Sequence, residues 1–125
     1  MRYITVRNAT RNVELGRRVR VINTLLDRAI GLLATRSLGA GEGVYLSPCT
    51  SIHTFFMRYP IDVLFLDAQG AVLSEGTFQP WRISGWHAQS KGTLELAAGT
   101  LKRTGTEVGD HIEMKDLPAG RQGFN

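Results

Sequence analysis

Two neighbouring apolar runs, residues 52–57 and 61–66, limit the folds open to this chain. Both have the length of a β-strand, and both carry apolar residues on both faces. Strands of this kind lie in the centre of a sheet and must be covered on two sides. Because the chain has few segments with helical periodicity, more sheet has to supply that cover. The pattern therefore predicts a mainly β fold, either a sandwich or a closed barrel.

Alternation of polar and apolar residues with a period of two predicts further strands. These strands are expected at residues 3–7, 13–15, 18–22, 44–46, 71–78 and 93–96, with a last one ending near residue 114. Asp67 and Gly70 occupy the first and fourth positions of a type I turn. We therefore expect residues 71–78 to pair back on the run at 61–66.

Two segments are expected to be helical. At residues 24–36 the apolar positions recur at helical spacing, and a short second helix is expected at about 97–104. At 125 residues the chain is long enough for one hydrophobic core. We expect a single domain over residues 1–116 and a disordered tail at 117–125.

The composition is that of an ordinary globular protein, with 42% hydrophobic and 21% charged residues. The first 28 residues hold seven arginines against Glu14 and Asp27. A basic segment attracts polyanions, but arginines scattered over alternating strand positions usually form a solvated face. No zinc-finger spacing, RNA-binding aromatic motif or helix-turn-helix pattern accompanies them, so nucleic acid is a disfavoured partner.

The sequence contains no apolar run of the roughly 18 residues that a membrane-spanning helix needs. Its N-terminal residues alternate polar and apolar side chains and lack the apolar stretch of a signal peptide. A single cysteine, Cys49, agrees with a reducing compartment. These features favour a cytoplasmic location.

His53 and Asp62 are polar residues that we expect to face inward from the two apolar runs. A buried histidine or carboxylate needs a hydrogen-bond or ion-pair partner, or its pKa shifts, and such sites are enriched for function. Each also has a structural interpretation. Asp62 would then accept turn amides or pair with Arg58 or Arg28, and His53 would be a satisfied core histidine.

A long loop at residues 79–92 holds Trp81, Trp86 and His87 together with basic residues. Loops of this length in compact domains are usually functional or mobile. Indole rings stack on sugars or bases, or anchor a protein partner. We expect Trp81 to plug the end of the sandwich and Trp86 to be partly open.

Several spaced motifs occur together in this chain. They are Arg28-x-x-Gly31-Leu32-Leu33-x-x-x-x-Leu38, Phe56-Met57-Arg58-x-x-Pro60-Ile61-Asp62-Val63-x-Phe65-Leu66-Asp67-x-x-Gly70-x-Val72, Leu94-Glu95-Leu96-x-x-Gly99 and Gly109-Asp110. This set resembles the DUF192 family, a domain of unknown function, over residues 10–114. The resemblance implies a compact, mostly β domain of a sandwich or jelly-roll-like kind with short helices, and it implies no established activity. Tyr59 departs from the family pattern, in which Asn is frequent at that position.

Cys49 and His53 form a Cys-x-x-x-His pattern, which suits a thiolate and its base or half of a metal site. Neither interpretation is well supported, because a zinc site needs further ligands and His87 and His111 lack the spacing to supply them. A small buried thiol is the usual state of a lone cysteine. We therefore expect no metal and no cofactor.

The function that the residues favour is a small non-enzymatic binding or accessory module, with a pocket near the 79–92 loop. Its partner would be a small polar ligand or a protein or peptide segment. The residues expected to contact this partner are His53, Arg58, Asp62, Trp86 and His87. The alternative is a hydrolase-like or metal-dependent enzyme that uses Asp62, His53 and Cys49. The sequence leaves open whether the chain is an enzyme and what its oligomeric state is.

Overall fold

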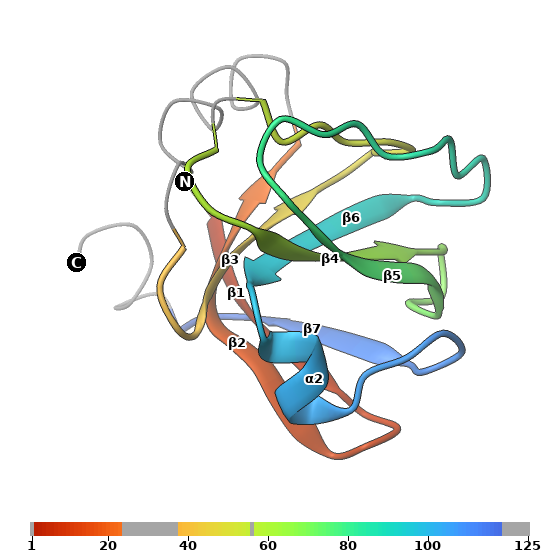
Figure 1. Ribbon diagram of the computed structural model, residues 1–125. Coiled ribbons are helices and arrows are strands. Elements are labelled where there is room, and N and C mark those ends of the chain that lie inside the picture. The colour runs from red at the N-terminus through yellow and green to blue at the C-terminus, as the bar shows by residue number, and fades with distance from the viewer. Residues whose placement is uncertain (1, 24–37, 56, 119–125) are drawn as a thin grey trace.

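Seven strands form one strongly curled sheet in the computed structural model, which describes residues 2–23, 38–55 and 57–118 (Figure 1). The elements are β1 (Arg2–Asn8), β2 (Val13–Ile22), β3 (Glu42–Leu46), β4 (Ile61–Leu66), β5 (Val72–Phe78), β6 (Gly92–Ala97), α2 (Thr100–Thr104) and β7 (Ile112–Asp116). The strand order is β5-β4-β6-β3-β2-β1-β7, and β2 and β3 are the one parallel pair in this sheet. In the described part of the chain, no helix has the length and apolar character to cross a membrane.

The two outermost strands of the sheet, β5 and β7, meet at one end. The Val72 amide donates to the Asp110 carbonyl at 2.9 Å, and the Gly109 amide donates to the Val72 carbonyl at 2.9 Å. An isolated bridge between Ala71 and His111 adds to this junction. The predicted mainly β class is confirmed, and the described strands form a single curled sheet, partly closed like a barrel, in place of two stacked sheets.

Most predicted strands and the short helix at 97–104 are found close to their expected positions. The strands predicted separately at 13–15 and 18–22 are wrong, because they form one strand, β2. The register between β1 and β2 is irregular near Val6, which lies opposite Gly16, and this irregularity accommodates the break in polar alternation between the two predicted strands. The helix predicted at 24–36 lies outside the described residues, as does most of the predicted tail at 117–125.

The strand predicted at residues 52–57 is also wrong. The ladder contact described for this segment is an isolated bridge between His53 and Ile83. Ile52 and Met57 nevertheless pack against β4, as the apolar run requires. An apolar run indicates that both of its sides are buried. It does not indicate whether the segment is a hydrogen-bonded strand or part of an irregular layer.

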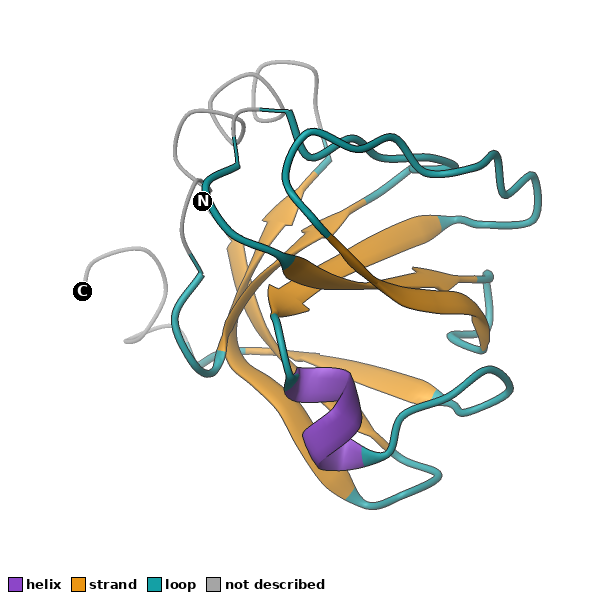
Figure 2. Cartoon of the chain, viewed as in Figure 1, coloured by secondary structure: helices purple, strands orange, loops and turns teal. Residues whose placement is uncertain are grey.

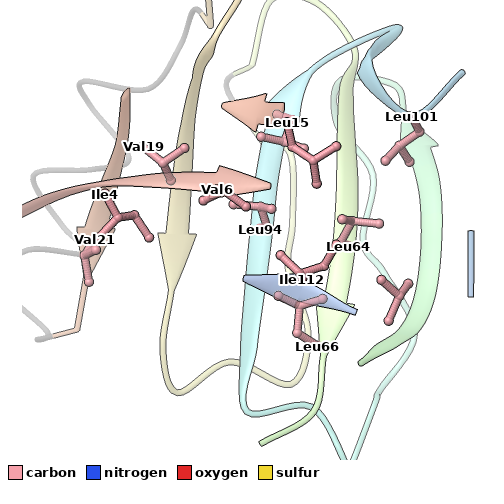
Figure 3. Close-up of a cluster of buried hydrophobic side chains, with 12 residues drawn as sticks. Ile4, Val6, Leu15, Val19, Val21, Leu64, Leu66, Leu94, Leu101 and Ile112 are labelled. Atoms are coloured by element: carbon pink, nitrogen blue, oxygen red, sulfur yellow. The ribbon is translucent and has the colours of Figure 1, made fainter. Parts of the chain in front are cut away.

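The core consists of two apolar clusters, one on each face of β4. The first fills the inside of the curl (Figure 3). Its members are Ile4, Val6, Leu15, Val19, Val21, Leu64, Leu66, Val72, Leu94, Leu96, Leu101 and Ile112. The second cluster covers the outer face and contains Cys49, Ile52, Met57, Ile61, Val63 and Phe65. Alternate residues of β4 enter different clusters, which explains why all of this strand is buried.

A buried polar network ties the end of β1 to the loop before β7. Oδ2 of Asp110 accepts hydrogen bonds from Asn8 Nδ2 at 2.9 Å, Arg11 Nε at 2.7 Å and the Glu107 amide at 3.1 Å. Burial by itself raises the pKa of the Asp110 carboxyl, but the hydrogen bonds from Arg11 and Asn8 outweigh it and the net pKa is lowered. This network is structural, and it accounts for the Gly109-Asp110 motif.

Gly43 allows β3 and β6 to approach each other. A Cβ at this position would lie 2.7 Å from the Glu95 carbonyl oxygen, a backbone atom that is held in the sheet. We therefore expect Gly43→Ala to lower the free energy of unfolding by about 1 to 3 kcal/mol. Gly85→Ala is the matched control, because a Cβ there meets nothing within 4 Å. Urea denaturation of both variants checks this, and equal small losses would contradict the close approach.

The Asp110 network should also make the protein acid-sensitive. The folded-state pKa of Asp110 lies below its unfolded value. Its ionised form therefore contributes stability above the unfolded pKa of about 3.9, and that contribution is lost as the pH falls through the folded value. We expect Asp110→Asn to be less stable than the parent at pH 6 and to lose less in Tm on acidification to pH 2.5. Glu75→Gln, an exposed control, should keep the parental slope in the same thermal melts.

Candidate functional site

Two segments without regular strands lie side by side over the outer face of β4, and we call residues 47–55 and 79–91 the outer layer (Figure 2). The Ser84 amide donates to the Ile52 carbonyl at 2.9 Å, and the Ser84 hydroxyl accepts from the Ile52 amide at 2.9 Å. Further along, the His87 amide donates to the Thr50 carbonyl at 2.8 Å. The long loop is therefore held at several points by residues 50–52, which overlap the start of the run predicted as a strand.

Thr54, which is fully buried, organises the turn in which the second segment begins. Its hydroxyl donates to the Gln79 carbonyl at 2.7 Å and accepts from the Arg82 amide at 2.8 Å. Its own amide donates to the Arg82 carbonyl at 2.8 Å, and its carbonyl accepts from the Trp81 amide at 3.0 Å. One buried side chain and its peptide groups thus fix residues 79–82.

Trp81 occupies a backbone conformation that bulky residues rarely adopt, with φ of 62°. This conformation costs of order 1 to 3 kcal/mol of folding free energy. It persists only where surrounding contacts hold it, as the Thr54 hydrogen bonds do here. Its side chain is 56% exposed, so the expectation that Trp81 plugs the end of the fold is wrong. The turn directs the indole ring toward solvent, and this arrangement requires a strained backbone at Trp81.

Three rings form a continuous stack on this surface. The Trp81 ring stacks on Phe55 with centroids 5.8 Å apart, and Phe55 stacks on His53 with centroids 4.7 Å apart. We call these three residues the aromatic platform. Trp86, at 73% exposed, and the exposed Ile83 belong to the same outer layer, and Trp86 is open as expected.

His53 does not face inward as expected, because it is exposed. Its Nδ1 accepts the Phe55 amide at 3.2 Å, which orients the ring for stacking. His87 is half-buried below the surface, with its ring centroid 4.0 Å from that of Phe65 on β4. Arg58 is exposed and lies outside the outer layer, three residues after the end of its first segment. His53, Trp86 and His87 thus all lie on the outer side of β4.

Asp62 lies elsewhere. It is 1% exposed and shares its strand face with the first apolar cluster, on the side of β4 opposite the outer layer. Its Oδ1 accepts from the Thr77 hydroxyl at 2.7 Å, and its Oδ2 accepts from the Leu101 amide at 2.9 Å in the first turn of α2. Because Gly99 at the N-cap has no side chain, Asp62 supplies the cap from a distant strand. The structural interpretation with an amide donor applies, Arg58 is not among the donors, and Arg28 lies outside the described residues.

The grouping needed by the enzyme alternative is not found. Cys49 is buried, and its thiol donates to the Ser51 carbonyl at 3.1 Å. His53 Nδ1 is occupied by a backbone amide, and both oxygens of Asp62 are engaged on the other side of the sheet. Within the described residues, no three His, Cys, Asp or Glu side chains gather closely enough to hold a metal ion.

Two residues that carry the site, and one buried carboxylate elsewhere in the sheet, were not singled out from the sequence. Thr54 and Phe55 lie in an apolar run that was predicted to be a strand, so neither was distinguished from its neighbours. Glu95, on β6, was noted only as part of a family motif. It is 9% exposed, and burial raises its pKa to about 7. The available signal was a carboxylate between Leu94 and Leu96 in a strand that is apolar on both faces.

The charge of the outer layer and its flanks is entirely positive. Residues 47–61 and 79–92 contain Arg58, Arg82 and Lys91 and no Asp or Glu. All three cationic residues are exposed. The charged residues of the segments that carry the aromatic platform are therefore all cationic.

Comparison with known sequences gives a consistent family assignment. The model of the DUF192 family, described as an uncharacterised ACR, matches residues 5–114. A UPF0127 protein of Pyrococcus horikoshii is 32% identical over 111 residues, which cover 85% of this chain and 95% of the relative. A UPF0127 protein of Pyrococcus abyssi is also 32% identical over 111 residues, covering 85% and 93% of the two chains. The resemblance read from the sequence motifs is confirmed.

Two solved structures share the fold. One, a putative transcription regulator from Sinorhizobium meliloti, has a TM-score of 0.72 and 24% identity, and the match covers 90% of this chain and 92% of the other. The second, a protein of unknown function from Novosphingobium aromaticivorans, has a TM-score of 0.68 and 20% identity, with coverage of 89% and 83%. At these identities the similarity establishes the fold alone.

The position of Asp62 predicts a structural phenotype. Asp62→Ala leaves the Thr77 hydroxyl and the buried Leu101 amide without their acceptor, so we expect a loss of about 2 to 4 kcal/mol in the free energy of unfolding. Trp86→Ala removes an exposed ring and should cost under about 1.5 kcal/mol. Urea melts compare the two. A similar small loss in both variants would mean that Asp62 does not cap α2.

Proposed function

We propose that this chain, which belongs to the DUF192 family, is a binding module that holds a segment of a partner protein on its aromatic platform. The family is described as uncharacterised, so the proposal rests on the geometry of the outer layer. Binding without a chemical step is favoured because the side chains of the enzyme alternative, Cys49, His53 and Asp62, have separate partners.

The observation that carries the proposal is the conformation and exposure of Trp81. A strained backbone is retained where the surrounding structure maintains it, and such strain clusters at ligand-contacting sites. Burying the exposed ring in the core would remove apolar surface from water, yet the Thr54 hydrogen bonds hold it outside. A preformed aromatic surface also loses little conformational entropy when it binds.

The partner chemistry follows from the exposed residues of the outer layer and its flanks. Flat, exposed rings contact apolar or aromatic side chains, and Arg58, Arg82 and Lys91 attract carboxylates. An open surface suits an extended polypeptide better than a small ligand, which needs a concave site that buries most of its area. We therefore propose an acidic segment with aromatic residues as the bound partner, and His53, Arg58, Trp86 and His87 as residues at or below its contact surface.

A Trp-free peptide that combines Asp, Glu and Phe tests this proposal directly. The chain's two tryptophans, Trp81 and Trp86, both lie in the outer layer, so binding should change the intrinsic fluorescence. Calorimetry should show an affinity at least about tenfold weaker for Trp81→Ala, which corresponds to about 1.4 kcal/mol. Val108→Ala, an exposed apolar residue outside the layer, is the matched control and should bind as the parent does.

Charge and salt complete the test. A peptide in which Lys replaces every Asp and Glu should bind much more weakly, and affinity for the acidic peptide should fall as ionic strength rises. Equal binding of both peptides would contradict the electrostatic part of the proposal. Unchanged affinity in Trp81→Ala would remove the platform as the contact surface.

A further inference from the structure

A cavity of about 230 Å³ lies at the end of the curl where the turn between β4 and β5 meets β7. Its lining includes Leu66, the turn at residues 67–70, and Tyr45 of β3, and β7 contributes Ile112 and Met114. Leu66 and Ile112 belong to the first apolar cluster (Figure 3). Tyr45 and Met114 pack against that cluster. The cavity therefore lies on the inner side of β4, whereas the aromatic platform lies over the outer face.

Hydrogen bonds fix the turn that forms one wall of this cavity. The Asp67 carboxylate accepts the Gln69 and Ala71 amides through Oδ1, each at 2.9 Å. The Gly70 carbonyl accepts the Ile112 amide at 2.8 Å, which ties the turn to β7. The wall is therefore in place before any molecule binds, and a preformed site loses little conformational entropy on binding.

Polar atoms of the lining remain available to a bound molecule. Both hydrogen bonds of the Asp67 carboxylate end on Oδ1, so Oδ2 can accept a further donor. The Tyr45 hydroxyl, which a Cβ at Gly92 would overlap, makes no hydrogen bond with the described residues. The His111 ring lies against Gly70, with its Cε1 atom 3.4 Å from where a Cβ of that residue would be. The cavity thus combines an apolar floor with a few polar groups, which is the usual composition of small-molecule sites.

We propose that this cavity is a second binding site, which takes one aromatic ring that carries N–H donors, as an aromatic amine or amidine does. The lining contains the Asp67 carboxylate and no Lys or Arg, so a donor or a cation matches it better than an anion. Tyr45 offers an aromatic face and Met114 a thioether, and both make favourable contacts with aromatic rings.

The size of the cavity limits the occupant to a small molecule. Sites for drug-sized ligands have volumes of about 300 to 1,000 Å³. At about 230 Å³ this cavity is smaller, so it suits a single ring with one substituent better than a molecule of nucleotide size.

Benzamidine and benzoate are matched probes, because they share one shape and differ in charge, and benzamidine has N–H donors where benzoate has acceptors. Binding is followed by the backbone amide NMR signals of Gln69, Gly70 and Ile112, which belong to the lining. We expect saturable shifts with benzamidine at millimolar concentration, and an affinity for benzoate that is at least about tenfold weaker. The indole N–H signals of Trp81 and Trp86 report on the outer layer and should not move.

Asp67→Asn separates the proposed contact from the role of this residue in the turn. The side-chain oxygen of the variant still accepts the two turn amides, while an NH₂ group replaces Oδ2 and cannot accept an N–H donor. We therefore expect the affinity for benzamidine to fall at least about fivefold. Asp116→Asn is the matched control, because it makes the same change at an exposed carboxylate of β7 outside the cavity lining. It should bind benzamidine as the parent does.

Unchanged benzamidine affinity in Asp67→Asn would overturn the proposal, as would the absence of saturable shifts at the lining amides of the parent. If Asp67→Asn does not fold, the two probes on the parent still decide the matter, because equal affinities for benzamidine and benzoate would rule out the carboxylate as the contact. The proposal does not depend on the aromatic platform, since the indole signals are read separately.

Discussion

The need to cover β4 on both faces governs the rest of this structure. The strand is hydrogen-bonded to β5 and β6, so neither its edges nor its faces meet water. The curl of the sheet covers the inner face, and the irregular outer layer covers the other. The outer layer is therefore part of the hydrophobic core as well as the location of the aromatic platform. A binding surface built on such a layer stays in place because removing it would expose the second apolar cluster.

Local patterns predicted much of the fold correctly. The hairpin of β4 and β5 follows from apolar runs joined by a turn with Asp67 and Gly70 at its ends, and the Asp67 carboxylate accepts two amides within that turn. Interactions between distant residues account for the errors. Nothing near Trp81 in the sequence predicts its positive φ, because the hydrogen bonds that maintain it come from Thr54. The same separation explains why the run at 52–57 was mistaken for a strand.

The candidate site was predicted in part for a related reason. The alternation of side chains along β4 correctly predicted that Asp62 is buried. It did not predict which side of the sheet the 79–92 loop covers. Asp62 and His53 consequently belong to opposite faces, one capping α2 and the other stacking on Phe55. Trp81, which defines the proposed site on the outer layer, departs from the lowest-energy backbone conformation for its residue type, and a sequence does not display that property.

The junction between the first residues of β5 and the loop before β7 also reduces the open margin of the sheet. An open sheet presents unpaired amides and carbonyls at its margins, and these act as templates for intermolecular pairing and aggregation. Here Val72 exchanges hydrogen bonds with Asp110 and Gly109, and the Ile112 amide donates to the Gly70 carbonyl. The backbone amides and carbonyls at the two margins of the sheet thus satisfy each other's hydrogen bonds where the margins converge. Gly70, with φ of 85°, forms the turn at which these margins converge, so fewer backbone groups at that end of the sheet remain open to pairing with another strand.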